Sequence, residues 1–351
     1  MGKNEMRFRD GEPTYVIAEI GANHNGDMEI AREMIRTAKN LECDSVKFQS
    51  WDTRIFSGAV YDDNYFLKDD YRNRDDYTLK GIVEKFALNE DQLTELKSYC
   101  DELKIDFAST PFEREQIDHL VRMDAPFIKI ASMDLNNDHL LTHAAATGKP
   151  ILLSTGFGTL SEIEHAIRTI EASGGREIVV LHCVSMYPPE DDQVNLNNMS
   201  MLKSAFGYPV GFSDHTMGTE ISLAAIALGA VVLEKHFTLD QSMFGWDHKI
   251  SATPSDLETI MSGVRRIHNA LGSYRRSPPE DEDQKSAYRR STVSAGPIKK
   301  GDIITEDHLT YQRPGTGLAP NMASQLIGMV AARDIPADTL IQLSDFVHAV
   351  S

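Results

Sequence analysis

Short apolar segments alternate with longer amphipathic segments along residues 1–271. The apolar runs are rich in β-branched and aromatic residues and have the length of buried strands. There are eight of them, at residues 15–19, 45–48, 106–108, 127–130, 151–153, 178–181, 210–212 and 231–233. Helical periodicity lies between most of them, at 28–40, 90–102, 160–172 and 220–228. This alternation requires a parallel sheet, and eight repeats predict an α/β fold closed into a (β/α)8 TIM barrel.

The pattern changes after a last helix at 254–271. Residues 273–287 contain Pro278-Pro279 and a run of acidic residues and show little periodicity, which indicates a linker. Beyond it, residues 298–309 are echoed by residues 335–346 at a constant offset of 37 positions. Such a duplication predicts a compact, pseudo-symmetric unit of short strands and turns. We therefore predict a barrel domain at 1–272, a linker at 273–287 and a small β-rich domain at 288–351.

The second βα connection is unusually long, because residues 51–80 insert a stretch rich in Tyr and Asp before the next helix. Long βα loops of barrels often carry function. A substrate lid, a dimer contact and a solvated surface insertion all remain open for this segment.

Composition narrows the classes of partner. The formal net charge is -18, which leaves no sequence-wide basic surface for nucleic acid. The three cysteines, Cys43, Cys100 and Cys183, form no C-x-x-C pair, so neither a disulfide framework nor a zinc ribbon is indicated. No stretch approaches 18 consecutive apolar residues. We expect a soluble, cytoplasmic protein with no membrane partner.

Reactive side chains gather where the predicted strands end, which is the functional face of a barrel. Lys47 and Lys129 lie inside apolar runs, where an unpaired ammonium is costly and an anionic ligand would relieve the cost. A salt bridge to a core Glu would relieve it as well. Hydroxyl groups follow on neighbouring strands, at Thr110, Ser132, Ser154 and Ser213. Together with the turn at Thr155-Gly156 they predict a cradle for phosphate and carboxylate groups.

Two histidines, His215 and His236, end consecutive strands, which are neighbours in a barrel. Their imidazoles can meet at the mouth and bind a divalent transition metal, leaving positions open for water and substrate. Glu19, Glu234 and Asp247 are candidate supporting acids. A hydrogen-bonded structural role is the alternative for each histidine.

Other enzyme classes lose support because G-x-G-x-x-G, G-x-x-x-x-G-K-[ST] and G-x-S-x-G do not open any βα unit. A Schiff-base aldolase using one of the lysines remains an alternative. A non-catalytic binding protein whose barrel serves only as a scaffold is disfavoured, because the lysine, serine and histidine residues at the strand ends are all present.

Several short motifs together resemble the sialic acid (nonulosonate) synthase family, across the whole barrel. They are Glu-Ile-Gly-Ala-Asn-His-Asn-Gly (19–26), Val-Lys-Phe-Gln (46–49), Ser-Thr-Pro-Phe (109–112), Lys-Ile-Ala-Ser (129–132), Leu-Ser-Thr-Gly (153–156), Phe-Ser-Asp-His-Thr (212–216) and Glu-Lys-His-Phe (234–237). The segment from 288, with Arg313-Pro-Gly and the duplicated pattern, resembles the antifreeze-like (SAF) domain of that family. A related barrel that condenses phosphoenolpyruvate with an aldose phosphate is disfavoured by this second domain.

The resemblance implies a metal-dependent condensation of phosphoenolpyruvate with an open-chain N-acyl hexosamine, giving a nine-carbon 2-keto-3-deoxy sugar acid and phosphate. It implies Mn2+ at His215 and His236, with Mg2+ or Co2+ possible. It also implies a homodimer with swapped domains, in which Arg313 reaches the sugar in the partner subunit. Phosphoenolpyruvate would be held by Lys47, Thr110, Lys129, Ser132, Ser154 and Ser213. Catalytic and sugar-binding roles would fall to Glu19, Gln49, Tyr187 and Asp247, with Asp134 and Arg313 at the sugar.

One departure concerns the sugar. Asp134 stands where many family members that use free N-acetylmannosamine have Glu, and the shorter arm leaves the acceptor open. We expect N-acetylmannosamine, with a diacetamido hexose leading to legionaminic or pseudaminic acid, or a 6-phosphate sugar, as alternatives.

Overall fold

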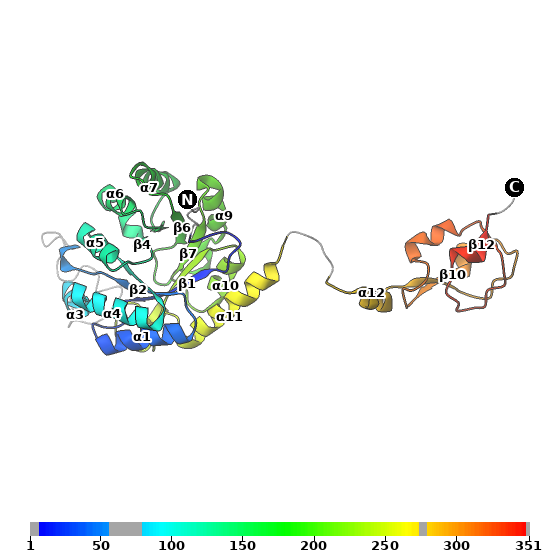
Figure 1. The fold of residues 1–351 in the computed structure, drawn as a ribbon, viewed down its shortest axis with the longest axis horizontal. Helices are drawn as coiled ribbons and strands as arrows, with labels where there is room; N and C mark the ends of the chain where they lie inside the picture. The colour runs from blue at the N-terminus through cyan, green and yellow to red at the C-terminus, as the bar shows by residue number, and fades with distance from the viewer. Residues whose placement is uncertain (1–6, 56–78, 274–278, 349–351) are drawn as a thin grey trace. The chain divides into compact units, whose positions relative to one another are not determined.

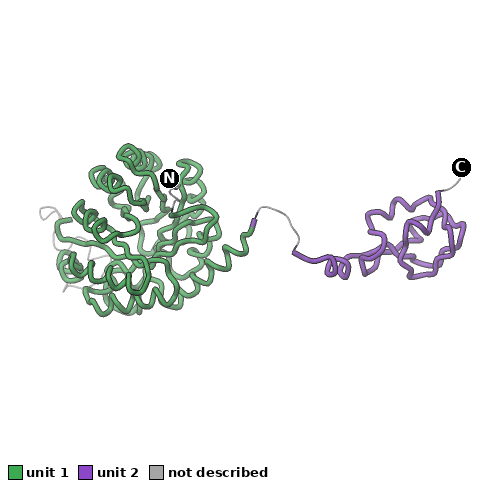
Figure 2. Tube along the Cα trace, viewed as in Figure 1, with its two compact units in different colours: residues 1–272 green, residues 273–351 purple. Residues whose placement is uncertain are grey.

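The computed structural model describes residues 7–55, 79–273 and 279–348. The chain divides into two compact units, residues 1–272 and 273–351 (Figure 2). Each unit has its own hydrophobic core.

The first unit is the predicted (β/α)8 barrel (Figure 1). Eight parallel strands follow the order β3-β2-β1-β8-β7-β6-β5-β4, and β3 lies against β4. The strands are β1 Tyr15–Gly21, β2 Ser45–Gln49, β3 Asp106–Thr110, β4 Ile128–Ile130, β5 Ile151–Ser154, β6 Ile178–Cys183, β7 Val210–Asp214 and β8 Val232–His236.

Helices cover the outside of this sheet (Figure 1). Their apolar stripes face the strands, and several start at capping boxes, such as Thr159 with Glu162 and Thr253 with Asp256. The α-helices are α1 Met28–Asn40, α3 Leu79–Phe86, α4 Glu90–Leu103, α5 Arg114–Arg122, α6 Asp138–Ala146, α7 Leu160–Ala172, α8 Asp191–Val194, α9 Asn197–Phe206, α10 Glu220–Ala227 and α11 Pro254–Leu271. Three 3-10 helices, η1 Thr53–Ile55, η2 Ser132–Asp134 and η3 His248–Ile250, lie in βα loops.

Alternation along the strands separates two hydrophobic cores. In β1, Val16, Ala18 and Ile20 belong to the large core between sheet and helices, whereas Ile17 belongs to the smaller core. The smaller core also contains Phe8, which is 2% exposed and packs edge-on against Tyr15 and Phe127. The barrel interior is therefore filled with side chains on its N-terminal side, which leaves the C-terminal side for a site.

Most strands extend beyond the ends that the sequence predicts. We expected β1 to end at residue 19 and β8 at residue 233, but they end at Gly21 and His236. Hydrophobicity marks the apolar part of a strand and misses the buried polar residues that continue it toward the mouth of the barrel. The candidate site residues therefore stand largely on regular strand backbone.

The second unit contains the predicted duplication. The 3-10 helices η4 Glu306–His308 and η6 Leu343–Asp345 correspond at the offset of 37, and a β-strand follows each of them directly. Ile298 and Ile335 form a bridge, and both lie in the core of the unit. Its strands are β9 Ser291–Ser294, β10 Leu309–Gln312, β11 Val330–Ala331 and β12 Phe346–Val347, with a further 3-10 helix, η5, at Pro320–Gln325.

One helix lies where we expected only a linker. The helix α12, Glu282–Tyr288, falls largely within residues 273–287. Asp281 and Gln284 form a capping box at its start, and Lys285 pairs with Glu282. These local contacts stabilise a short helix in a segment that has no apolar periodicity.

Of the expected insertion at 51–80, residues 56–78 lie outside the described residues. Its role as a lid or a dimer contact therefore stays a prediction. None of the helices in the described part of the chain combines the length and hydropathy that a membrane span requires.

Candidate active site

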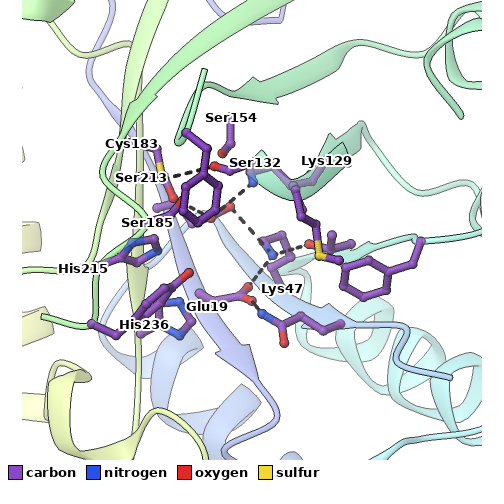
Figure 3. Close-up of a pocket in the computed structure, with 18 of the residues that line it drawn as sticks. Glu19, Lys47, Lys129, Ser132, Ser154, Cys183, Ser185, Ser213, His215 and His236 are labelled. Atoms are coloured by element: carbon purple, nitrogen blue, oxygen red, sulfur yellow. Dashed lines mark hydrogen bonds and ion pairs between the residues drawn. The ribbon is translucent and has the colours of Figure 1, made fainter. Parts of the chain in front are cut away.

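A cavity of about 180 Å³ opens at the C-terminal ends of the barrel strands (Figure 3). It brings together most of the residues that the sequence marks as functional, contributed by loops and strands around the barrel. The predicted residues that line it are Glu19, Lys47, Gln49, Thr110, Lys129, Ser132, Ser154, Tyr187, Ser213, His215 and His236. Their individual roles stay predictions.

Strand register explains why these side chains meet. Glu19 pairs across the sheet with Lys47 on one side and with His236 on the other. Ser213 is the register partner of Glu234. Register partners in parallel strands point to the same face, so all five side chains lie on the inner side of the barrel.

Both buried lysines are paired with carboxylates, which is the second of the two possibilities that the sequence left open. Lys47 Nζ lies 2.7 Å from Glu19 Oε2 and donates a hydrogen bond of 2.6 Å to Thr110 Oγ1. Lys129 Nζ lies 3.5 Å from Glu234 Oε1, which also accepts a hydrogen bond of 2.9 Å from Ser213 Oγ. The pairing satisfies the ammonium groups without excluding a further anion.

The two carboxyl groups differ in proton affinity. Burial raises the pKa of Glu19 to about 7, even though Lys47 beside it acts in the opposite direction. Burial would also raise the pKa of Glu234, but Lys129 and Lys47 together outweigh burial and lower it to about 2. Glu234 is therefore the fixed counter-charge, and Glu19 is the group that can gain or lose a proton near neutral pH.

Hydroxyl groups at the ends of β4 and β5 form another wall of the cavity. Ser154 Oγ is buried and finds no hydrogen-bond partner among the described residues. Ser132 Oγ accepts a hydrogen bond of 3.0 Å from the backbone N–H of Gly156. A Cβ atom at Gly156 would stand 2.2 Å from Ser185 Oγ and 2.6 Å from Ser132 Oγ, so only glycine fits there. This wall offers the hydroxyl groups of Ser132 and Ser154 to an anion. The predicted N–H groups of the turn are already bonded, Thr155 to Leu181 O and Gly156 to Ser132 Oγ.

The two histidines face each other across the mouth, with ring centroids 5.3 Å apart. His215 Nδ1 donates a hydrogen bond of 2.8 Å to Val184 O, so a metal would have to bind at Nε2 and displace the proton there. Burial and the neighbouring His215 lower the pKa of His236 well below its usual value, so that ring is neutral.

These two rings fit a divalent metal as two ligands of a larger set. In the described part of the chain no group of three His, Cys, Asp or Glu side chains is arranged to hold an ion. Asp247 Oδ2 lies 3.6 Å from His236 Nδ1, beyond hydrogen-bond distance. Remaining ligands would have to come from water or substrate, as an open catalytic site requires.

The cysteine beside His215 was not predicted as a site residue. Cys183 lines the cavity, and its Sγ accepts from Ser132 Oγ at 3.5 Å. Burial would lower the pKa of His215, but the Cys183 thiol group outweighs burial and raises it to about 9. The sequence indicated only that Cys183 forms no disulfide, and the three cysteines are indeed free.

A second cavity of about 250 Å³ adjoins the first and shares four lining residues with it. The shared residues are Gln49, Trp51, Tyr187 and His236. Asp247 lines this second cavity, together with Trp246. Trp51 stacks between Phe112, at 4.4 Å, and Trp246, at 5.2 Å, and forms an aromatic wall.

Trp51 also orients polar groups of the first cavity. Its indole Nε1 donates to Gln49 Oε1, and Gln49 Nε2 donates a hydrogen bond of 3.0 Å to Glu19 Oε1. Trp51 and Trp246 were not among the predicted site residues, although Trp51 stands only two residues beyond Gln49. Tyr187, which was predicted, stacks on His215 with centroids 4.2 Å apart.

Two predicted residues lie outside both cavities. Asp134 is buried, and its Oδ1 accepts a hydrogen bond of 3.0 Å from Asn137. Arg313 belongs to the second unit, where its guanidinium lies 5.2 Å from the ring centroid of Tyr288. Their roles at the sugar stay predictions. His182, the third strand-end histidine, donates to Val194 O at 2.6 Å and is structural.

Comparison with known proteins agrees with this arrangement. Residues 34–276 match the NeuB family, and residues 289–347 match the SAF domain. An N,N'-diacetyllegionaminic acid synthase from Campylobacter jejuni is 38% identical over 94% of this chain and 99% of its own length. An N-acetylneuraminate-9-phosphate synthase from Drosophila melanogaster is 35% identical over 97% of this chain and 87% of its own.

A solved structure shows the same architecture. The N-acetylneuraminic acid (sialic acid) synthetase from Leptospira borgpetersenii superposes with a TM-score of 0.70 at 31% identity, over 81% of this chain and 93% of that one. The family match covers most of the barrel, and the SAF match covers most of the second unit. The chain therefore belongs to the NeuB family and carries a SAF domain after its barrel.

Proposed function

We propose that this protein condenses phosphoenolpyruvate with the open-chain aldehyde of an N-acyl hexosamine and releases phosphate. The observation that carries the proposal is the cavity in which two buried lysines, an unpartnered serine hydroxyl and two facing histidines meet. The related synthases from Campylobacter jejuni and Drosophila melanogaster, which span nearly the whole chain, support it.

Phosphoenolpyruvate would lie in the first cavity. Lys47 and Lys129 supply positive charge, while Thr110, Ser132, Ser154 and Ser213 supply hydroxyl groups for its phosphate and carboxylate. The partner-free Ser154 Oγ is the clearest mark of a missing acceptor, because buried hydroxyls are ordinarily hydrogen-bonded.

In the reaction, C3 of phosphoenolpyruvate attacks the aldehyde carbon, and the aldehyde oxygen takes up a proton to become a hydroxyl. Water then adds to the resulting cationic C2, and Glu19 accepts the proton that this water loses. The tetrahedral intermediate expels phosphate by cleavage of the C–O bond, and its C2 hydroxyl gives its proton to the departing phosphate, leaving a 2-keto acid with three more carbons. The proton that Glu19 took from the water balances the one that the aldehyde oxygen took up. The pKa of Glu19, about 7, suits both acceptance and return of a proton.

A divalent metal bound by His215 and His236, Mn2+ by preference with Mg2+ or Co2+ as alternatives, would polarise the aldehyde oxygen as a Lewis acid. The carbonyl of Val184 orients His215 through Nδ1, and burial together with His215 keeps His236 neutral. Gln49, held by Trp51, keeps the Glu19 carboxyl group directed at the cavity.

The acceptor would occupy the second cavity, beside Asp247 and the aromatic wall. N-acetylmannosamine is the simplest sugar that fits the proposal. A hexose with two acetamido groups is a second candidate, because the aromatic wall of Trp51 and Trp246 adds apolar surface to the cavity for acyl methyl groups. The legionaminic acid synthase relative supports that candidate.

The proposal is tested by phosphate release from phosphoenolpyruvate with Mn2+ and, in turn, N-acetylmannosamine, its 6-phosphate and 2,4-diacetamido hexoses. Release that requires both the metal and one sugar would support the reaction and identify the acceptor. A folded protein that binds phosphoenolpyruvate but releases no phosphate with any of them would contradict an N-acyl hexosamine acceptor. Absence of phosphoenolpyruvate binding would contradict the whole proposal.

We also propose that the working unit is a homodimer in which Arg313 completes the partner's site. Exposed apolar side chains at the rim of the barrel, among them Phe157 at 80% exposure, are consistent with a covered surface. Mixing Arg313→Ala subunits with His215→Ala subunits should restore one working site in each mixed dimer. Mixed dimers that remain inactive would count against a shared site.

A further inference from the structure

The loop after β8, residues 237–251, forms much of the wall of the second cavity. It contributes Gly245, Trp246, Asp247, Lys249 and Ile250 to the lining. It contributes nothing to the lining of the first cavity. The position of this loop therefore bears on the second cavity alone.

Asn23, in the loop after β1, connects three parts of this segment. The side chain is 1% exposed, and its Nδ2 donates hydrogen bonds of 2.8 Å to Phe237 O and to Ser251 Oγ. Its Oδ1 accepts from the backbone N–H of Asp247 at 3.3 Å, and Ser251 Oγ donates to Asp247 O at 2.6 Å. One amide thus fixes the beginning, the middle and the end of the loop.

Asn25, two residues later, holds the same loop at a second point. Its Nδ2 donates a hydrogen bond of 2.7 Å to Phe244 O, and its Oδ1 lies 3.2 Å from His248 Nε2. His248 Nδ1 in turn lies 2.7 Å from Thr238 Oγ1. Because Asn25 Oδ1 can only accept, His248 carries its proton on Nε2 and accepts at Nδ1.

Close packing at Gly245 strengthens this connection. A Cβ atom there would lie 2.4 Å from Asn25 Oδ1 and 2.5 Å from His248 Nε2. The next residue, Trp246, stacks on Trp51 at 5.2 Å with an interplanar angle of 10°. Displacing the loop would therefore separate the two indoles.

We infer that Asn23 and Asn25 are positioning residues for the acceptor sugar: they hold Trp246 and Asp247 in place and leave phosphoenolpyruvate binding unaffected. The inference rests on the proposed function insofar as it assigns the second cavity to the sugar. It gives a role to the Asn-His-Asn segment, whose side chains contact neither the lysines nor the serines of the first cavity in any described hydrogen bond.

The experiment compares Asn23→Ala and Asn25→Gly with the control Thr14→Val. Asn25 has a φ of 53°, which glycine adopts without strain, so this variant removes only the side-chain contacts. Thr14→Val also removes one buried hydrogen bond, the 2.7 Å bond to Ala230 O, but far from both cavities at the start of β1. Gly245→Ala is a further variant, which displaces the loop without removing any polar group.

The first readout needs no substrate. Trp51 and Trp246 are the only two tryptophans in the chain, so near-UV circular dichroism of the folded protein reports on their stacking. We expect the three loop variants to lose most of this signal and Thr14→Val to keep it. Thermal melts confirm that each variant is folded before its spectrum is compared.

The second readout separates the two substrates. We expect kcat/KM for the sugar to fall about a hundredfold in the loop variants, as for a misplaced substrate-positioning group, while phosphoenolpyruvate affinity by calorimetry changes less than about twofold. Equal losses for both ligands, an unchanged spectrum in folded loop variants, or a matching loss in Thr14→Val would each overturn the inference. If no sugar is turned over by the wild type, the proposed function fails while the spectra still decide the role of Asn23 and Asn25.

Discussion

Buried charged side chains lie on both faces of strands β7 and β8, but the two faces differ in how completely these side chains are hydrogen-bonded. On the outer face, Asp214 and Lys235 are register partners whose charged atoms lie 3.0 Å apart. Asp214 also accepts from Thr216 N, Thr216 Oγ1 and Ser222 Oγ, and Lys235 donates to Thr216 O. This outer network is hydrogen-bonded throughout.

On the inner face, one residue before and one residue after Lys235, the situation is different. Glu234 Oε2 and His236 Nδ1 are buried and have no hydrogen-bond partner within the described residues. Unsatisfied buried polar atoms are costly, so a fold keeps them where something outside the chain satisfies them. The comparison shows that burial and charge alone do not mark a site, and that the inner face differs in the polar atoms that the protein leaves without a hydrogen bond.

The largest expected effect, on turnover, comes from replacing Glu19, the group on the inner face that transfers a proton in the proposed reaction. Glu19→Gln keeps the size of the side chain and its contact with Gln49 but removes the ability to accept a proton. We expect kcat to fall by about 10²–10⁴-fold, while calorimetry still detects phosphoenolpyruvate binding. Loss of binding in parallel with turnover would contradict the proposed role of Glu19.

On the outer face, breaking the ion pair should cost stability instead. Asp214→Leu or Lys235→Met leaves one buried charge without its partner, and we expect a loss of about 3–5 kcal/mol in the free energy of unfolding. The double variant should recover most of this loss, because an apolar pair of similar volume replaces both charges. Urea titrations followed by near-UV circular dichroism of the barrel tryptophans measure these differences.

Arg265→Ala is the matched control for the ion-pair variants. It breaks a pair with Glu42 in which the two side chains are 57% and 71% exposed, and we expect it to change the free energy of unfolding by less than about 1 kcal/mol.

A double variant of Asp214 and Lys235 that is as unstable as the single variants would show that Asp214 matters through Thr216 and Ser222 more than through Lys235.

The sequence could predict which side chains meet, because the functional residues of a barrel lie at the C-terminal ends of its strands. Alternation puts Lys47, Lys129, Ser213, His215 and His236 on the inner face, and the barrel makes them converge, so their meeting follows from pattern alone. Which carboxylate pairs with which lysine depends on the relative register of strands far apart in sequence, as for Lys129 and Glu234, and could not be derived.

Contacts outside the strands were harder to predict. Alternation also puts Asp214 and Lys235 on the outer face, but their partners Thr216 and Ser222 lie outside the strands and could not be derived from it. Trp246 lies in a loop without periodicity, placed by side-chain contacts with Asn23 and Asn25 that no local pattern encodes. The helix α12 was missed for a related reason, since a capping box stabilises it where apolar periodicity is absent.

A smaller effect, on ligand affinity and stability, should distinguish Ser154 in the cavity from Ser222 on the outer face. Ser154→Ala removes a hydroxyl that has no partner within the described structure, so stability should be unchanged or slightly higher. Phosphoenolpyruvate affinity should fall about tenfold to a hundredfold, the value of a hydrogen bond to a charged group. Ser222→Ala is the control, because its hydroxyl donates to Asp214 on the outer face.

The control should show the reverse pattern, with reduced stability and unchanged affinity for phosphoenolpyruvate. Calorimetry and urea unfolding on both variants provide the four values. Equal affinities for Ser154→Ala and the wild type would remove Ser154 from the anion site.

The smallest effect concerns pH. In the folded protein the pKa of Glu19 is about 7, above its ordinary value of 4.5, so the folded state holds this proton more tightly than the unfolded chain. Below pH 4.5 the group is protonated in both states and contributes nothing. As pH rises toward 7 the unfolded chain ionises first, and the wild type should lose stability relative to Glu19→Gln by on the order of 1–3 kcal/mol.

Glu234→Gln is the control for the direction of this pH dependence, because the pKa of Glu234 is shifted the other way. The pKa of Glu234 is lowered to about 2, so its contribution to stability is fully present above pH 4.5 and is lost only as pH falls toward 2. Between pH 5 and 8 Glu234 itself does not titrate, so the Glu234→Gln difference should change only as far as loss of this charge lowers the pKa of Glu19, whereas the difference for Glu19→Gln changes with the full titration of that group. Urea unfolding at intervals across this range measures both, and a constant difference for Glu19→Gln would show that Lys47 keeps Glu19 ionised and that its proton is unavailable to the reaction.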